Sequence, residues 1–299
     1  MGHIITDLKE AFRRGNVYIQ LIFINVGVFV ITTLIGILLQ LFNRSAAGIF
    51  ELLALPASFT RFAWQPWSIF TYMFMHAGFL HILFNMLWLY WFGALFLYFF
   101  SGKHLRGLYI VGGICGGLLY MISYNVFPYF RPMTAYSTMV GASASVLAIV
   151  VATAYREPNY PVRLLFFGNV RLKYLALIVV LTDLLFITSS NAGGHIAHLG
   201  GALAGLWFAA SLNKGKDITS WVNKALDAIA ALFSAKTWKR KPKMKVHYGN
   251  NTRQNDYDYN ARKKAQSDEI DRILDKLKKS GYESLTTEDT KSLFDASKR

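Results

Sequence analysis

The chain has little charge and almost no cysteine for its length. Charged residues make up 16% of its 299 residues, hydrophobic residues make up 54%, and Cys115 is the single cysteine. One thiol excludes a framework of intrachain disulfides. The low charge, together with a mean hydropathy of +0.30, argues against an ordinary soluble enzyme and indicates a membrane protein.

The apolar residues are gathered into stretches that are long enough to cross a bilayer. Residues 17–41 carry no charge, are too long for a signal peptide, and are followed by no small-residue cleavage site. Comparable stretches follow near residues 79–100, 105–127, 138–155, 172–190 and 196–213. The predicted fold class is therefore all-α: a six-transmembrane-helix bundle over residues 17–213, between a cytoplasmic N-terminal segment (1–16) and a small helical tail (214–299).

Positive charge is distributed unevenly among the segments that join these stretches. With six spans, both termini lie on one side of the membrane. That side holds most of the lysine and arginine residues outside the spans, namely Lys9, Arg13, Arg14, Lys103, Arg106, Arg156, Arg163, Arg171 and Lys173. The opposite side holds Arg44, Arg61 and Arg131. The positive-inside rule therefore predicts cytoplasmic N- and C-termini, and spans two, four and six then begin at the non-cytoplasmic face.

Polar residues suited to acyl transfer lie near the starts of these three spans. Ser143 is the candidate nucleophile, and His198 is the candidate general base, because an imidazole beside a serine hydroxyl can accept its proton. His81 and Asn85 are four residues apart on one helix face, and both can donate to an oxyanion, as can the backbone N–H of Ser143. Polar groups at membrane depth are costly, so the pattern predicts an intramembrane serine protease whose site opens to the non-cytoplasmic side.

Structural interpretations of the same residues remain open at this stage. The run around Ser143 could be a small-residue patch for helix packing, and Ser145 is a competing hydroxyl on a different face. Gly201 and Gly205 form a Gly-x-x-x-Gly pair that we expect to pack against Gly141 and Ala144. That contact between spans four and six would itself bring Ser143 close to His198.

Metal binding and a catalytic triad are the two alternatives to a simple dyad. His195 lies three residues before His198, but the chain has no His-Glu-x-x-His sequence, so no metal site is predicted. Asp183 is the one acid in a span that could complete a triad, and the sequence does not place it against His198. We therefore expect a Ser143–His198 dyad that needs no metal, nucleotide or other cofactor.

Four sequence blocks together resemble the rhomboid family of intramembrane serine proteases. The blocks are residues 67–76, 81–85, 141–143 and 197–205, in the order and spacing of that family. The resemblance implies a six-helix fold with a water-filled site, Ser143 as nucleophile, His198 as base, and His81 and Asn85 in the oxyanion hole. It also implies single-pass transmembrane protein substrates and, for a chain of bacterial type, a location in the cytoplasmic (inner) membrane.

Two residues depart from the pattern that the resemblance implies. Ala144 follows the serine where family members most often have glycine, and Leu147 stands where many members place an aromatic ring against the histidine. The second departure bears on how the imidazole of His198 is oriented.

The tail is basic and has its own helical patterns. Residues 218–235 have apolar residues at helical spacing and precede the basic run 236–245, which predicts a helix on the cytoplasmic leaflet or a solvated connector. The partners expected for the tail are anionic lipids or a cytoplasmic protein, and not nucleic acid. Residues 248–262 are expected to be a flexible linker. After it we expect a helical hairpin in which Gly281 ends one helix and Thr286 and Asp289 cap the next.

Two other functions are weighed against the protease. The first is a catalytically silent rhomboid-like protein that binds or escorts membrane clients, a class that loss of the serine or histidine would mark. Both residues are present here. The second is a small transporter, for which paired halves or broken helices around a midplane site would be expected, and the sequence shows no convincing internal repeat.

Overall fold

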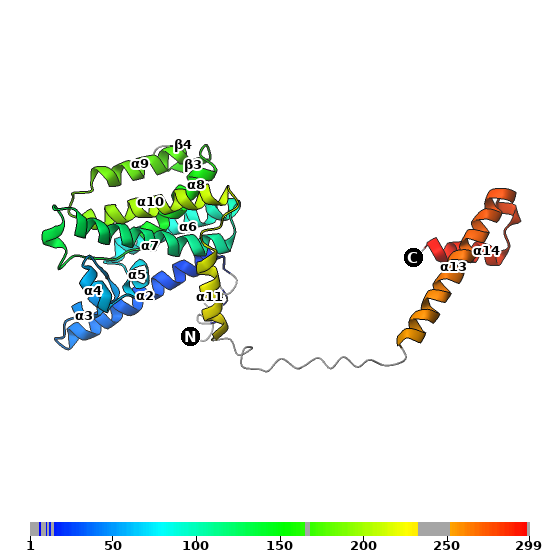
Figure 1. Cartoon of the computed structure of the whole chain (residues 1–299), viewed down its shortest axis with the longest axis horizontal. Helices are drawn as coiled ribbons and strands as arrows, with labels where there is room; N and C mark the ends of the chain where they lie inside the picture. The colour runs from blue at the N-terminus through cyan, green and yellow to red at the C-terminus, as the bar shows by residue number, and fades with distance from the viewer. Residues whose placement is uncertain are drawn as a thin grey trace. The chain divides into compact units, whose positions relative to one another are not determined.

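The structure is a computed structural model that describes Thr6, Glu10, Phe12 and residues 15–164, 168–232 and 252–297. The chain forms two compact units, Met1–Thr237 and Trp238–Arg299. The first unit is a helical membrane domain, and the described part of the second is a pair of helices (Figure 1). Most of the expected N-terminal segment lies outside the described residues.

Four helices of the first unit are long and apolar enough to cross a membrane: α2 (Val17–Leu41), α6 (Phe79–Phe99), α7 (Gly102–Val126) and α10 (Ala192–Leu212). Two shorter helices, α8 (Ser143–Arg156) and α9 (Leu172–Leu185), occupy the fourth and fifth predicted spans. Both are shorter than predicted, because residues 138–142 form a strand and a glycine turn, and the helix of α9 gives way to turns after Leu185. The chain is thus a mostly helical membrane protein with four long apolar helices.

The all-α prediction misses two small antiparallel ribbons. Strand β1 (Leu55–Pro56) pairs with β2 (Thr138–Met139), and β3 (Pro161–Leu164) pairs with β4 (Gly168–Arg171). Strands of two to four residues are too short to show the alternating pattern from which a strand is predicted. The first ribbon matters for the site because it fixes the segment that leads into Ser143.

The segment between α2 and α6 is itself folded. It contains three short helices, α3 (Ala47–Leu53), α4 (Phe59–Trp64) and α5 (Ser68–Thr71), and a 3₁₀ turn, η1 (Tyr72–Phe74). The hydroxyl of Tyr72 donates to the carbonyl of Gly113 on α7 (2.6 Å), and its own carbonyl accepts from the N–H of Gly141 (3.0 Å). A further 3₁₀ turn, η2 (Arg131–Met133), lies between α7 and β2. Tyr72 therefore ties the turn before Ser143 to the body of the domain.

Helices α7, α8 and α10 pack against one another, and α7 and α10 run side by side in Figure 1. A Cβ atom at Gly112 of α7 would lie 2.5 Å from the methyl of Ala148. A Cβ at Gly116, one turn later, would lie 2.6 Å from the methyl of Ala144. On the other side, Gly201 and Gly205 of α10 lie directly against the carbonyls of Ala144 and Ala148, so a Cβ there would overlap the backbone of α8. Glycines on both neighbours thus allow the three backbones to approach closely, as is common in membrane bundles.

Helix α11 (Ser220–Leu232) packs on the start of α7. Arg106 donates from Nε to Oδ1 of Asn223 (3.0 Å) and from Nη2 to Oδ1 of Asp227 (3.0 Å). The amide of Asn223 in turn donates to the carbonyl of Lys103 (3.0 Å), and Val222 is buried. The expected helix over 218–235 is therefore present but packs on protein, while the basic run 236–245 lies outside the described residues.

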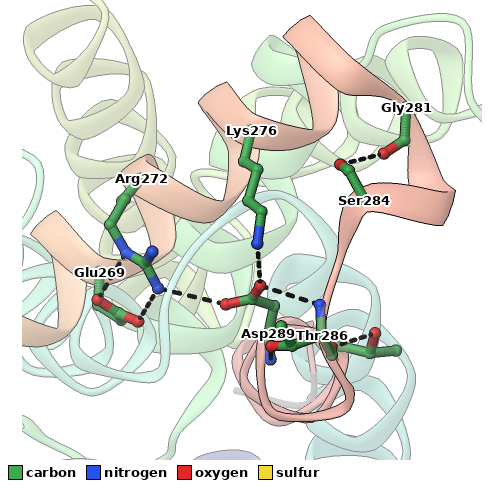
Figure 2. Close-up of polar contacts among 8 residues, drawn as sticks. Glu269, Arg272, Lys276, Gly281, Ser284, Thr286 and Asp289 are labelled. Atoms are coloured by element: carbon green, nitrogen blue, oxygen red, sulfur yellow. Dashed lines mark hydrogen bonds and ion pairs between the residues drawn. The ribbon is translucent and has the colours of Figure 1, made fainter.

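The second unit contains the predicted hairpin, formed by α13 (Thr252–Ser280), the turn η3 (Tyr282–Ser284) and α14 (Thr287–Ser297). Gly281 has a φ of +73° and its N–H donates to the carbonyl of Leu277, which confirms it as the end of α13. The predicted cap is confirmed as well: Asp289 N–H donates to Thr286 Oγ1 (3.2 Å), and Thr286 N–H donates to Asp289 Oδ2 (3.1 Å; Figure 2).

The flexible-linker prediction is wrong from Thr252 onward. Residues 252–262 are the first turns of α13, and the part of the predicted linker before Thr252 lies outside the described residues. Every described side chain from 257 to 262 is exposed, so this part of α13 has no apolar stripe from which a helix could be predicted.

Candidate active site

A cavity of about 680 Å³ opens among α6, α7, α8, α9 and α10. The four residues predicted for the site all line it: Ser143, His198, His81 and Asn85. Aromatic side chains (Trp88, Tyr120 and Tyr124) and polar residues of the connecting segments (Ser137, Ser190 and Asn191) complete much of its wall. Residues that are far apart in sequence are therefore brought to one hollow by the contacts of α8 with α6 and α10.

Ser143 is the first residue of α8. Its backbone N–H is one of the four at a helix start that have no partner within the helix, and the positive end of the helix dipole lies there. Both features favour negative charge beside the serine, which is the charge that a tetrahedral acyl-transfer intermediate carries on its oxygen.

Gly141 separates His81 from Ser143. A Cβ at this position would lie 2.9 Å from Nε2 of His81 and 3.6 Å from Oγ of Ser143, and φ is +135°, which glycine adopts without strain. We expected Gly141 to pack against Gly201 and Gly205. The structure places it beside the cavity instead, and the glycines of α10 face Ala144 and Ala148, because α8 begins only after the turn that Gly141 forms.

His81 directs one ring nitrogen toward this region. The N–H of Ala77 donates to Nδ1 of His81 (3.4 Å), so in the neutral ring the proton is on Nε2. Nε2 is the nitrogen beside Gly141 and Ser143, and it is therefore a donor on that side. Asn85 uses one amide hydrogen to donate to the carbonyl of His81 (2.8 Å), and the amide has a second hydrogen for a ligand.

His198 is held by an acid that the sequence left unplaced. Oδ1 of Asp183, on α9, lies 2.8 Å from Nδ1 of His198 and 2.8 Å from Nδ1 of His195. The carboxylate is 4% exposed. A carboxylate oxygen only accepts, so Nδ1 of His198 carries a proton and Nε2 of the neutral ring has the free lone pair. A base that attacks a serine proton needs that lone pair.

Asp183, His195 and His198 are also the group among the described residues whose donor atoms lie close enough together to hold a metal ion, within 4.8 Å of one another. However, the two imidazole nitrogens already point at one carboxylate oxygen at hydrogen-bond distance. Nδ1 of each imidazole, the nitrogen that a metal ion would need, is therefore engaged by Oδ1, whereas Oδ2 of Asp183 has no hydrogen-bond partner among the described residues.

Two polar residues that are close to the site in sequence, Ser145 and His76, lie away from the cavity. Ser145 is fully buried, and its Oγ would lie 2.8 Å from a Cβ at Gly113, so it faces α7. His76 is 3% exposed and packs edge to face on the ring of His81, with 5.1 Å between centroids. The methyl of Ala144 packs against Gly116, which explains how alanine is accommodated there, whereas Leu147 lines the cavity.

The pairing of Asp183 with two histidines is the contact in the candidate site that sequence reasoning missed. Its signal was a lone acid in an apolar span, which indicates a partner without naming it. The turn between α9 and α10, residues 186–191, decides that Asp183 meets His195 and His198, and no periodic pattern describes that turn.

Comparison with known proteins assigns the membrane domain to a family. A model of the rhomboid domain matches residues 63–214, which is about half of the chain. The chain belongs to the rhomboid family. Rhomboid proteins are typically intramembrane serine proteases, and the matched region includes all of the cavity-lining residues described above.

A curated relative is similar to about half of the chain. The chain is 29% identical over 158 residues to RHOMBOID-like protein 12, mitochondrial, of Arabidopsis thaliana. The aligned region is 50% of this chain and 47% of that relative, so the chain spans about half the length of the relative it matches. Residues 254–299, which include most of the hairpin of the second unit, match a separate family of unknown function.

Proposed function

We propose that this rhomboid is an intramembrane serine endopeptidase that cleaves transmembrane proteins through Ser143 and His198. The observation that carries the proposal is the single cavity that Ser143 and His198 line together with two side-chain donors, His81 and Asn85. Acyl transfer requires a nucleophile, a base and oxyanion donors around one space where the substrate carbonyl can sit.

The chemistry follows from the protonation states that the contacts imply. Nε2 of His198 accepts the proton of Ser143 as Oγ attacks the carbonyl carbon. The oxyanion that forms is stabilised by Nε2–H of His81, the amide of Asn85 and the backbone N–H of Ser143. His198 then gives its proton to the leaving amine, the acyl-enzyme remains on Ser143, and a water activated by the same imidazole releases the acid product.

The substrate class follows from where the cavity lies. It is formed between helices of a membrane domain, so the peptide bond reaches it from within or beside the bilayer. A stable helix hides its peptide bonds in intrahelical hydrogen bonds, and we therefore expect cleavage where small or helix-weakening residues let the substrate unwind. With α8 and α9 as further spans, the membrane domain would have six. We place it in the cytoplasmic membrane of a bacterium, where the tail would meet anionic lipid or a cytoplasmic partner.

Labelling with a fluorophosphonate tests the proposal without knowledge of the substrate. The purified full chain should label covalently, Ser143→Ala should abolish labelling, and His198→Ala should slow it by on the order of 100-fold or more. Ser145→Ala is the matched control, because that hydroxyl is buried against α7 and should not be the labelled atom.

The opposite result identifies the alternative class. A folded wild-type protein that never labels, or that labels equally well without Ser143, would be inconsistent with a serine protease. It would favour a rhomboid-like protein that binds or escorts membrane clients without cleaving them.

A further inference from the structure

Asp183 is the buried acid of the membrane domain, within the residues described from 15 to 232. Burying a carboxylate costs several kcal/mol unless the charge is paired and hydrogen-bonded. On the same helix, the apolar side chains of Leu181 and Leu184 are 46% and 53% exposed, whereas the charged residue Asp183 is buried. An acid turned inward from such a helix needs a compensating partner, and it has two.

Both partners are imidazoles that contact the same oxygen. His195 and His198 are three residues apart on α10, and Nδ1 of each lies 2.8 Å from Oδ1 of Asp183. Their rings meet edge to face, with 6.1 Å between centroids. The carboxylate oxygen is thus held between two donors, so neither the acid nor the ring of His198 can rotate without losing a charge-assisted hydrogen bond.

The residue at the position where the resemblance implies an aromatic ring against the histidine offers no such restraint. Leu147 lines the cavity one turn after Ser143, and its aliphatic side chain neither donates nor accepts a hydrogen bond. Asp183 is therefore the polar group in the described structure that fixes which nitrogen of His198 carries the proton.

We propose that Asp183 is a positioning residue that holds His198 in the tautomer whose Nε2 accepts the proton of Ser143, and that stabilises the imidazolium formed on attack. His195, the second donor to the same oxygen, keeps the carboxylate in place. This inference rests on the proposed serine protease function and turns its dyad into a Ser143–His198–Asp183 arrangement, in which the acid acts only through the histidine.

The experiment measures the rate at which a fluorophosphonate inactivates the full chain in detergent, separated into the limiting rate and the half-saturating probe concentration. Asp183→Leu should lower the limiting rate by on the order of 100-fold, and it should leave the half-saturating concentration within about threefold. Asp183→Glu, which keeps the carboxylate, should recover part of the rate. Thr182→Val is the matched control, because it removes an exposed polar group from the adjacent position of α9.

A spectroscopic readout separates positioning from support of the fold. Nitrogen-15 NMR of labelled histidine should show His198 protonated at Nδ1 in the wild type and a shift toward the other tautomer in Asp183→Leu. If the leucine variant does not fold, the isosteric Asp183→Asn variant replaces it and should still lower the limiting rate by at least about 10-fold, because the charge that stabilises the imidazolium is gone.

Each contrary result is distinct. A wild type that fails to label contradicts the proposed protease. A wild type that labels, with folded Asp183→Leu or Asp183→Asn variants that label at the same limiting rate, contradicts only the role of Asp183. Stoichiometric zinc bound to the wild type and lost in Asp183→Asn would also overturn it, since the three side chains would then be metal ligands.

Discussion

At the scale of single residues, the candidate site depends on Gly141, a position at which a larger side chain would not fit. Gly141 has a positive φ, and a Cβ at this position would lie 2.9 Å from Nε2 of His81 and 3.6 Å from Oγ of Ser143. A larger residue would have to displace the histidine or the turn, and the turn is fixed by the hydrogen bond from Gly141 to the carbonyl of Tyr72. Because glycine has no Cβ, Nε2 of His81 and Oγ of Ser143 can both lie close to position 141.

Gly141→Ala should lower the fluorophosphonate labelling rate by at least about 10-fold, because the strained backbone costs about 1–3 kcal/mol and the methyl presses on His81. Gly168→Ala is the matched control. Gly168 also has a positive φ (+68°), but nothing lies within 4 Å of the added methyl. Equal rates for the two variants would show that the contact with His81 does not matter.

At the scale of elements, helix packing was easier to predict than the site that it builds. The Gly-x-x-x-Gly pair at 201 and 205 indicated a close contact with the fourth span, and the structure has that contact, at Ala144 and Ala148. The glycines of α7 at 112 and 116 complete the other side. What the sequence did not reveal was the register, because small residues recur along α8 and any of several could have met α10.

Short and irregular elements account for most of the remaining differences. The ribbon of β1 and β2 joins segments more than 80 residues apart, and only the folded chain brings them together. The early turns of α13 are rich in polar residues and have no apolar stripe in their sequence, so composition suggested a linker where the structure has a helix. By contrast, the cap at Thr286 and Asp289 was predictable because its two hydrogen bonds are local in sequence.

The hairpin of α13 and α14 should lose stability in acid. Asp289 is 6% exposed at its side chain and bonds to Thr286, Lys276 and Arg272 (Figure 2). The hydrogen bond from the Thr286 backbone and the one from Lys276 lower the pKa of Asp289 from 3.8 to about 2. Since the folded pKa is the lower one, this stabilisation is complete above about pH 4 and is lost as the pH falls toward 2.

Hydrogen exchange of the α14 amides, corrected for the intrinsic effect of pH, measures this loss in the full chain. Protection should fall between about pH 4 and pH 2 in the wild type. Asp289→Asn should be less protected at neutral pH and change little over that interval, while Asp295→Asn, an exposed acid on the same helix, should behave as the wild type. Protection that is independent of pH in the wild type would contradict the role given to Asp289.

At the scale of the whole molecule, a group of basic residues lies at the end of the membrane domain away from the cavity. Lys103 and Arg106 begin α7 beside α11, and Arg156 ends α8 within 3.5 Å of Asn213 at the end of α10. The cavity lies at the other end of α8, where Ser143 begins it. Because positive charge favours the cytoplasmic side, the cavity is expected to open to the opposite one.

Single cysteines in a Cys115→Ala background can measure this orientation in intact cells. Tyr136→Cys, next to the cavity-lining Ser137, should react with a membrane-impermeant maleimide added outside. Asn169→Cys, in the exposed β4 strand between α8 and α9, should react only after the membrane is permeabilised. The reverse pattern would place the cavity on the cytoplasmic side.

Because α8 packs against α10, which follows it in the sequence, the candidate site can form only late in the synthesis of the membrane domain. Ser143 is made well before the ribosome reaches α10, which supplies both His198 and the glycines that receive α8. Until α10 emerges, the nascent chain has the nucleophile without its base, and α8 lacks one of its two principal supports. The proposed proteolytic centre therefore cannot form during synthesis until the last helix of the bundle arrives.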